Sequence, residues 1–402
     1  MKKTLVLAAF GAFMMAGVVS QVGAQSKVIN FGWSGAITGP TSDAGSKYAL
    51  GVADYCKWAN EKQPIAGYTL KCETRDDNYD NSKTQRNVED YAQNVKVSGF
   101  LGYSTGGTLQ IRSLLRELQL PAVTGTYHAG LLDGPDGDYV FLPISSYSEQ
   151  LVSLVEYVKS LNPNAKIAFV ANPSPFGRLP VEDGKKAAAK LGLEVVASDE
   201  VGAGNLDNTA LLKRYESLGV THIIHQNTYG PVSNIVKDAK RLGLDKKFTQ
   251  LGAHYAGGDD LINLGGPAAE NFLWTTGYWL YDEDNQPGMK IIREMAKLAG
   301  RPETDASSVH YTAGTAAVAI MVEAARRASK GEVTNKTIYE QLLKMNKANS
   351  YASPFSISKV DYTADDHTGS RNLRLFQAKK GKWVVVTPSV VSKLFKQIHP
   401  GR

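Results

Sequence analysis

Cysteine is scarce in this chain, and charge of one sign is nowhere concentrated. The 402 residues include two cysteines, Cys56 and Cys72, and 45 basic against 39 acidic residues, for a formal charge of +6. None of the seven histidines lies between residues 26 and 100, so the cysteines have no nearby imidazole with which to hold zinc. A charge this small, spread over a chain this long, also argues against nucleic-acid binding.

Motifs of common nucleotide-binding and catalytic sites are missing as well. The glycine-rich segment at residues 102–108 lacks the Gly-x-Gly-x-x-Gly spacing of dinucleotide sites and the Gly-Lys-Ser/Thr of a phosphate loop. No Gly-x-Ser-x-Gly or His-Glu-x-x-His motif occurs. His222 and His225 are three apart on an expected strand, where they face opposite sides. The sequence therefore predicts no metal site, no cofactor and no catalytic residue, and favours a protein that is not an enzyme.

An apolar run near the N-terminus is too short to be a membrane span, which takes about 20 residues. Lys2 and Lys3 precede this run, which extends from Leu5 to Val19, and small residues lead up to Ala24. This is the pattern of a secretory signal peptide cleaved after Ala24. No cysteine at that site could carry a lipid, so we expect a protein exported through the inner membrane to the periplasm.

In an oxidising compartment, an isolated pair of cysteines is most simply a disulfide. We therefore expect a bond between Cys56 and Cys72, which are 16 residues apart. Closing a loop of this length stabilises a fold by about 3 kcal/mol in the chain-entropy model. Two buried free thiols are the alternative.

Short apolar runs alternate with amphipathic helical stretches in two successive series, a pattern typical of parallel sheets with crossover helices. In the first series we expect strands at residues 28–33, 68–75, 97–102 and 121–124 and helices at residues 46–61, 83–95 and 109–118. In the second series we expect helices at residues 149–161, 181–191, 208–218 and 232–242 and strands at residues 166–171, 194–198, 221–225 and 249–251.

The two series predict an α/β fold of two Rossmann-like lobes. Residues 139–144 and 272–278 fall between the series and are expected to cross between the lobes as hinge strands. Helices at residues 290–299 and 308–329 and a hairpin over residues 371–387 follow. The expected division is a signal peptide at residues 1–24, a first lobe of residues 25–144 and 279–353, and a second lobe of residues 145–278 and 354–402.

Ligands of open α/β sheets bind beyond the carboxyl ends of the strands, so the loops there are the candidate site. The clearest loop contains Gly106 and Gly107, just before the helix expected from Leu109. Backbone amides and the helix dipole would favour a carboxylate at this place. Glycines that merely form a tight turn, with Thr108 capping the helix, explain the same residues equally well.

Several short segments carry a family resemblance. Residues 28–33 followed by Gly35-Ala36-Ile37-Thr38-Gly39-Pro40, the strand end at Leu101-Gly102, residues 166–170 with Phe176-Gly177, and residues 239–243 are similar to the leucine/isoleucine/valine-binding family of periplasmic solute-binding proteins. The resemblance extends over essentially the whole mature chain and implies the type I periplasmic-binding fold. Members of this family deliver a ligand to an ABC importer or, in some relatives, sense it.

The resemblance also implies a binding site shared by both lobes. The positions that match the family's ligand-contacting segments are Thr105, Gly106, Gly107, Thr126, Tyr127 and His128 in the first lobe and Phe176 and Tyr229 in the second. Ala44 stands where relatives often carry an aromatic residue. His254 stands where amino-acid-binding relatives place the acid that holds the ammonium group, and Asp259 is the nearest acid.

We therefore expect a monomeric solute-binding component of an ABC importer, which closes two lobes on a small carboxylate-bearing ligand and delivers it to a permease in the inner membrane. Because burying an ammonium group without a carboxylate is unfavourable, an aromatic or aliphatic acid fits these residues at least as well as an amino acid. Two alternatives remain. One is a ligand-sensing module for a receptor kinase, and the other is an exported hydrolase that would use Asp76, His128 or His254.

Overall fold

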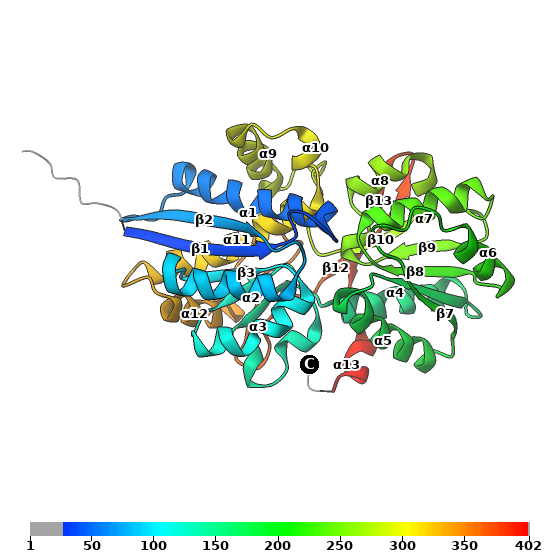
Figure 1. The fold of residues 1–402 in the computed structure, drawn as a ribbon, viewed down its shortest axis with the longest axis horizontal. Helices are drawn as coiled ribbons and strands as arrows, with labels where there is room; N and C mark the ends of the chain where they lie inside the picture. The colour runs from blue at the N-terminus through cyan, green and yellow to red at the C-terminus, as the bar shows by residue number, and fades with distance from the viewer. Residues whose placement is uncertain (1–26, 401–402) are drawn as a thin grey trace, which may run out of the picture.

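The computed structural model describes residues 27–400, so the predicted signal peptide lies outside the described residues. Two lobes lie side by side along the long axis of the molecule, and each is built on one sheet (Figure 1). Within residues 27–400, no helix combines the length and the apolar character that crossing a membrane requires. The α/β fold with two mainly parallel sheets is therefore the one that the sequence predicts.

The first sheet is entirely parallel and has the strand order β11-β5-β4-β3-β1-β2. Its strands are β1 (Lys27–Gly35), β2 (Tyr68–Asp76), β3 (Gly99–Gly102), β4 (Ala122–Thr124), β5 (Val140–Ile144) and β11 (Thr368–Ser370). The helices of this lobe are α1 (Ser42–Lys62), α2 (Asn81–Asp90), α3 (Thr105–Glu117), α9 (Pro287–Ala299), α10 (Glu303–Ala306), α11 (Val309–Ala328) and α12 (Asn335–Leu343).

The second sheet has the order β13-β12-β10-β9-β8-β6-β7, and the predicted C-terminal hairpin forms its antiparallel edge. Its strands are β6 (Lys166–Ala171), β7 (Glu194–Glu200), β8 (His222–Gln226), β9 (Thr249–Gly252), β10 (Leu273–Thr276), β12 (Leu373–Lys379) and β13 (Lys382–Val390). Its helices are α4 (Tyr147–Leu161), α5 (Pro175–Lys190), α6 (Thr209–Ser217), α7 (Tyr229–Arg241), α8 (Asp259–Gly265) and α13 (Lys393–Ile398).

The chain crosses between the sheets three times rather than the predicted two. The crossings lie between β5 and α4, after β10, and between β11 and β12. The third was missed because β11 is a three-residue strand without apolar alternation. Since β11 pairs with β5, residues 368–370 lie in the first sheet, whereas the sequence assigned them to the second lobe.

The three crossings meet at Gly277. A Cβ atom at this position would lie 3.1 Å from Cγ2 of Ile144 on the first crossing and 3.3 Å from the carbonyl oxygen of Asn372 on the third. Because a side chain here would require its neighbours to shift slightly, the glycine favours the close packing of all three crossings.

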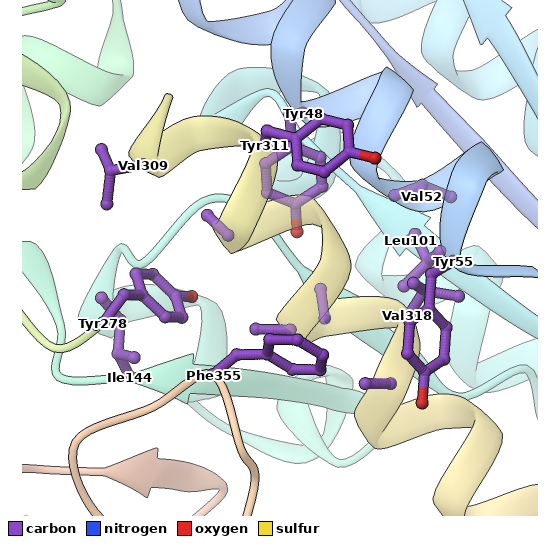
Figure 2. Close-up of a cluster of buried hydrophobic side chains, with 14 of the residues drawn as sticks. Tyr48, Val52, Tyr55, Leu101, Ile144, Tyr278, Val309, Tyr311, Val318 and Phe355 are labelled. Carbon is purple, nitrogen blue, oxygen red and sulfur yellow. The ribbon is translucent and has the colours of Figure 1, made fainter. Parts of the chain in front are cut away.

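Helices α1 and α11 pack together in the core of the first lobe, and a glycine on each helix allows their backbones to approach closely. A Cβ atom at Gly51 would lie 2.2 Å from the carbonyl oxygen of Tyr311, and one at Gly314 would lie 2.1 Å from that of Tyr48. Around this contact, apolar side chains of both helices pack with residues of the sheet, as Figure 2 shows for Val52, Val318 and Leu101. The apolar helix α11 is therefore a core helix, as predicted.

The predicted disulfide between Cys56 of α1 and Cys72 of β2 is present, with a Cα–Cα distance of 6.0 Å. It joins the first helix to the second strand on the edge of the first sheet. Such a bond acts mainly by restricting the unfolded chain.

We expect replacement of both cysteines by serine to lower the free energy of unfolding by about 3 kcal/mol, because the unfolded chain regains the entropy of an open loop. Urea denaturation followed by circular dichroism measures this change. Reductant should lower the midpoint of the wild-type protein and leave that of the double variant unchanged. An unchanged wild-type midpoint in reductant would contradict a stabilising disulfide.

Candidate functional site

A cavity of about 210 Å³, counting the part that opens to solvent, lies where the two lobes meet. Its walls consist of Thr41, Tyr79, Tyr103, Thr105, Tyr147, Phe176, Thr228 and Tyr255. The first five of these follow strands β1, β2, β3 and β5, and the last three follow β6, β8 and β9. The cavity therefore lies beyond the carboxyl ends of the strands, where ligands of open α/β sheets bind.

Helix α3 begins at Thr105 rather than at the predicted Leu109. Its cap is Ser104, whose hydroxyl accepts a hydrogen bond of 3.1 Å from the Gly107 amide, and not Thr108. Because the first amides of a helix have no partner inside it, those of Thr105 and Gly106 must find acceptors elsewhere. Thr105 lines the cavity, so a positively polarised helix end lies at its wall.

Two threonine hydroxyls stand together at this wall. The Oγ1 atoms of Thr105 and Thr126 are hydrogen-bonded, and both side chains are buried. The carbonyl oxygen of Thr126 accepts a further hydrogen bond of 2.6 Å from the Thr124 hydroxyl. The structure thus brings together two of the residues that the sequence assigned to ligand binding.

Gly106 and Gly107 lie against helix α2 and not in the cavity wall. A Cβ atom at Gly106 would lie 2.8 Å from Oδ1 of Asn81, and one at Gly107 would lie 2.6 Å from Oγ1 of Thr84. Their small size therefore permits α3 to pack closely on α2. This is a packing role, which differs from the tight turn considered in the sequence.

Phe176 and Tyr229 lie in the first turns of α5 and α7, which begin at Pro175 and Tyr229 and not at the predicted residues 181 and 232. Phe176 lines the cavity, and Tyr229 lies directly after the cavity residue Thr228. The Tyr229 hydroxyl donates a hydrogen bond of 2.7 Å to the carbonyl oxygen of Asp43 in the other lobe.

Tyr127 and His254 lie behind the cavity wall. The Tyr127 ring stacks on Tyr255 at 5.9 Å, and its hydroxyl is 3.1 Å from that of Tyr278. Nδ1 of His254 is 2.9 Å from Oγ1 of Thr276. Burial, together with nearby His310, lowers the pKa of His254 well below its ordinary value, so its ring is neutral at neutral pH. Neither residue is among those that line the cavity.

Ala44, His128 and Asp259 also lie outside the cavity wall. Ala44 is buried in the first turn of α1. The ring of His128 lies beside Gly130. Asp259 begins α8, and burial, with smaller contributions from Asp282 and Asp260, raises its pKa to about 7.

Asp43, which the sequence analysis did not single out, joins the two lobes. Its Oδ2 accepts a hydrogen bond of 3.0 Å from the Gly230 amide at the start of α7, and its Oδ1 accepts one of 2.9 Å from the Ala44 amide. Burial raises the pKa of Asp43, while hydrogen bonds from the Thr228 hydroxyl and these amides oppose the increase. One carboxylate is thus shared by the first turns of α1 and α7, and we call this contact the Asp43 clasp.

Of the eight residues of the cavity wall, the sequence analysis assigned Thr105 and Phe176 to ligand binding and gave no such role to the other six. They are Thr41, Tyr79, Tyr103, Tyr147, Thr228 and Tyr255. Tyr103, Thr228 and Tyr255 come within three residues of the ends of β3, β8 and β9, and this position after a strand was the available signal. Across residues 27–400, no group of three or more His, Cys, Asp or Glu side chains is arranged to hold a metal ion.

The chain is similar to many known proteins, three of which are described here. A solved branched-chain amino acid ABC transporter protein from Thermus thermophilus, with bound valine, is 49% identical, superposes with a TM-score of 0.91, and is covered over 99% of its length by 93% of this chain. The leucine-, isoleucine-, valine-, threonine- and alanine-binding protein of Pseudomonas aeruginosa is 21% identical over 86% of this chain and 88% of its own length.

A third relative, the solute binding protein of an ABC transporter from Rhodopseudomonas palustris in complex with 3,4-dihydroxybenzoic acid, is 16% identical, with a TM-score of 0.76 over 90% of this chain and 96% of its own. At this identity the likeness shows a shared fold.

A model of the family described as "Periplasmic binding protein" matches residues 28–382. Two lobes with parallel sheets, a cavity at the strand ends and this match over most of the chain agree, and the protein belongs to the periplasmic binding protein family.

Proposed function

We propose that this protein is the periplasmic solute-binding component of an ABC importer and that it captures a small amino acid of the branched-chain type between its two lobes. The observation that carries the proposal is the cavity at the lobe interface, to which both sheets contribute residues. The aromatic and hydroxyl side chains that line this cavity have the composition of a small-molecule site with a few orienting polar groups.

The carboxylate of the ligand would bind at the start of α3. Thr105 and Thr126 offer hydroxyl groups there, and the helix offers amides and the positive end of its dipole. The Thermus relative, with its bound valine, supports an amino acid over the aromatic acid that the sequence favoured equally.

Closure of the lobes would trap the ligand. Tyr255 of the second lobe donates a hydrogen bond of 2.5 Å to the carbonyl oxygen of Gly125 in the first, and the Asp43 clasp joins α1 to α7. Rotation at the three crossing segments would separate these contacts and open the cavity. A monomer performs this movement by itself, and the closed form would then dock on the permease in the inner membrane.

The hydrolase alternative has little support from the residues it would use. Asp76 accepts hydrogen bonds from the amides of Ile37 and Thr38, which hold the loop after β1. None of Asp76, His128 and His254 lines the cavity. A sensing module would share the binding site, and transport assays with the permease separate it from an importer component.

Isothermal titration calorimetry with L-valine, L-leucine and 4-hydroxybenzoate tests the ligand class. We expect valine or leucine to bind at least about tenfold more tightly than the aromatic acid, because both amino acids carry the paired carboxylate and ammonium groups of the valine bound to the Thermus relative. Small-angle scattering should show a more compact protein with the ligand bound. Tighter binding of the aromatic acid, or turnover of any of the three ligands, would contradict the proposal.

Replacement of Asp43 by alanine tests closure. The Gly230 amide and the Thr228 hydroxyl would be buried without their acceptor, so we expect ligand affinity to fall about tenfold or more, mainly through faster dissociation. Stopped-flow fluorescence measures the association and dissociation rates of the ligand separately. The matched control is Asp80→Ala, which removes a carboxylate that accepts a 2.9 Å hydrogen bond from the Lys83 amide within one lobe. An equal loss of affinity in both variants would argue against an inter-lobe role for Asp43.

A further inference from the structure

Five of the eight residues around the cavity are aromatic, and their rings contact one another edge to face. We call Tyr79, Tyr103, Tyr147, Phe176 and Tyr255 the aromatic box. The rings of Tyr103 and Tyr255 meet at 89° with centroids 6.0 Å apart, and those of Phe176 and Tyr255 meet at 85° and 5.7 Å. The ring planes of Tyr79 and Tyr103 meet at 70°, and those of Tyr147 and Phe176 meet at 67°. Neighbouring rings are therefore steeply inclined to one another.

The wall of the cavity contains no charged side chain. Its other members are three threonines, and burial raises the pKa of Tyr79 to about 12, so this phenol stays protonated at neutral pH. Asp43 does not line the cavity, and its carboxylate is bonded to Gly230, Ala44 and Thr228. An ammonium group in the cavity would therefore meet rings and hydroxyls rather than a carboxylate.

We propose that, when the lobes have separated to admit a ligand and close again on it, the ring faces of the aromatic box hold the cationic nitrogen of that ligand. The site consequently accepts betaines, in which this nitrogen is fully methylated, as well as primary amino acids. The inference rests on the proposed function, because it takes the ligand to be a zwitterion whose carboxylate lies at the start of α3. The negative face of an aromatic ring attracts a cation and needs no N–H donor, so methylation of the nitrogen leaves this attraction in place.

The site can be probed with two molecules of the same composition. Trimethylglycine is a constitutional isomer of valine, so the two contain the same atoms, and their volumes are closely similar. Its carbon analogue, 3,3-dimethylbutanoate, has nearly the same shape but no positive charge. The three ligands therefore separate the effects of size, of N–H donors and of the cation.

Isothermal titration calorimetry on the full mature protein gives the dissociation constants. We expect trimethylglycine to bind within about tenfold of valine and about thirtyfold more tightly than 3,3-dimethylbutanoate, as a desolvated cation–ring contact would give. Equal or tighter binding of 3,3-dimethylbutanoate would overturn the inference, because the box would then be merely apolar. Binding of valine without trimethylglycine would overturn it as well, since N–H donors would then be required.

Phe176 offers a variant that tests the ring itself, since no hydrogen bond of its side chain is disturbed. We expect Phe176→Leu to weaken the binding of trimethylglycine about tenfold and that of 3,3-dimethylbutanoate less than twofold. Phe176→Tyr keeps an aromatic ring at this position and should bind both ligands as the wild-type protein does. An equal effect of Phe176→Leu on both ligands would contradict the role of the ring. Circular dichroism and the melting temperature establish that each variant is folded.

Asp43→Asn tests whether the Asp43 carboxylate, and not the aromatic box, holds the cationic nitrogen. Because the Asp43 clasp acts on closure of the lobes, we expect this variant to weaken the binding of trimethylglycine and of 3,3-dimethylbutanoate by similar factors. A selective loss of the zwitterions would assign the cation to Asp43 and overturn the inference. If neither valine, leucine nor trimethylglycine binds the wild-type protein, the proposed function fails together with the inference, whereas binding of valine alone refutes only the inference.

Discussion

The carboxyl ends of parallel strands from both sheets face one another across the lobe interface, and the rest of the site depends on this arrangement. Each residue of the cavity wall follows such a strand end. Crossover helices begin at the same ends, so their unpaired amides and positive dipole ends gather there as well. Thr105, Phe176 and Thr228 thus come from three different strand–helix junctions and still line one cavity.

The fold also requires that backbone segments approach one another closely at a few places. Gly277 allows the three crossings to pack together, and Gly51 and Gly314 allow α1 to lie against α11. Gly230 has a related role, since a Cβ atom there would lie 2.7 Å from Oδ2 of Asp43. Small residues therefore occur at the hinge, in the core and at the clasp, where bulk would separate elements that must touch.

Helix starts account for much of the difference between the sequence analysis and the structure. Apolar periodicity begins only after the first turn of α3, α5 and α7, because those turns carry glycine, proline and cavity residues such as Thr105 and Phe176. The sequence therefore located the loops correctly but assigned helical first turns to them. Ser104 and Pro175, a capping residue and a proline in the first turn, were the local signals for the earlier starts.

The order of elements, the pairing of Cys56 with Cys72 and the family resemblance could all be predicted from the sequence, because each rests on local periodicity, composition or motifs. The tertiary structure decided which side chains line the cavity, since Tyr79, Tyr147 and Tyr255 come together only through the packing of the two lobes. It also decided the partner of Asp43. A hydrogen bond between residues 187 positions apart leaves no periodic trace in the chain, because only the packing of the lobes brings its two ends into contact.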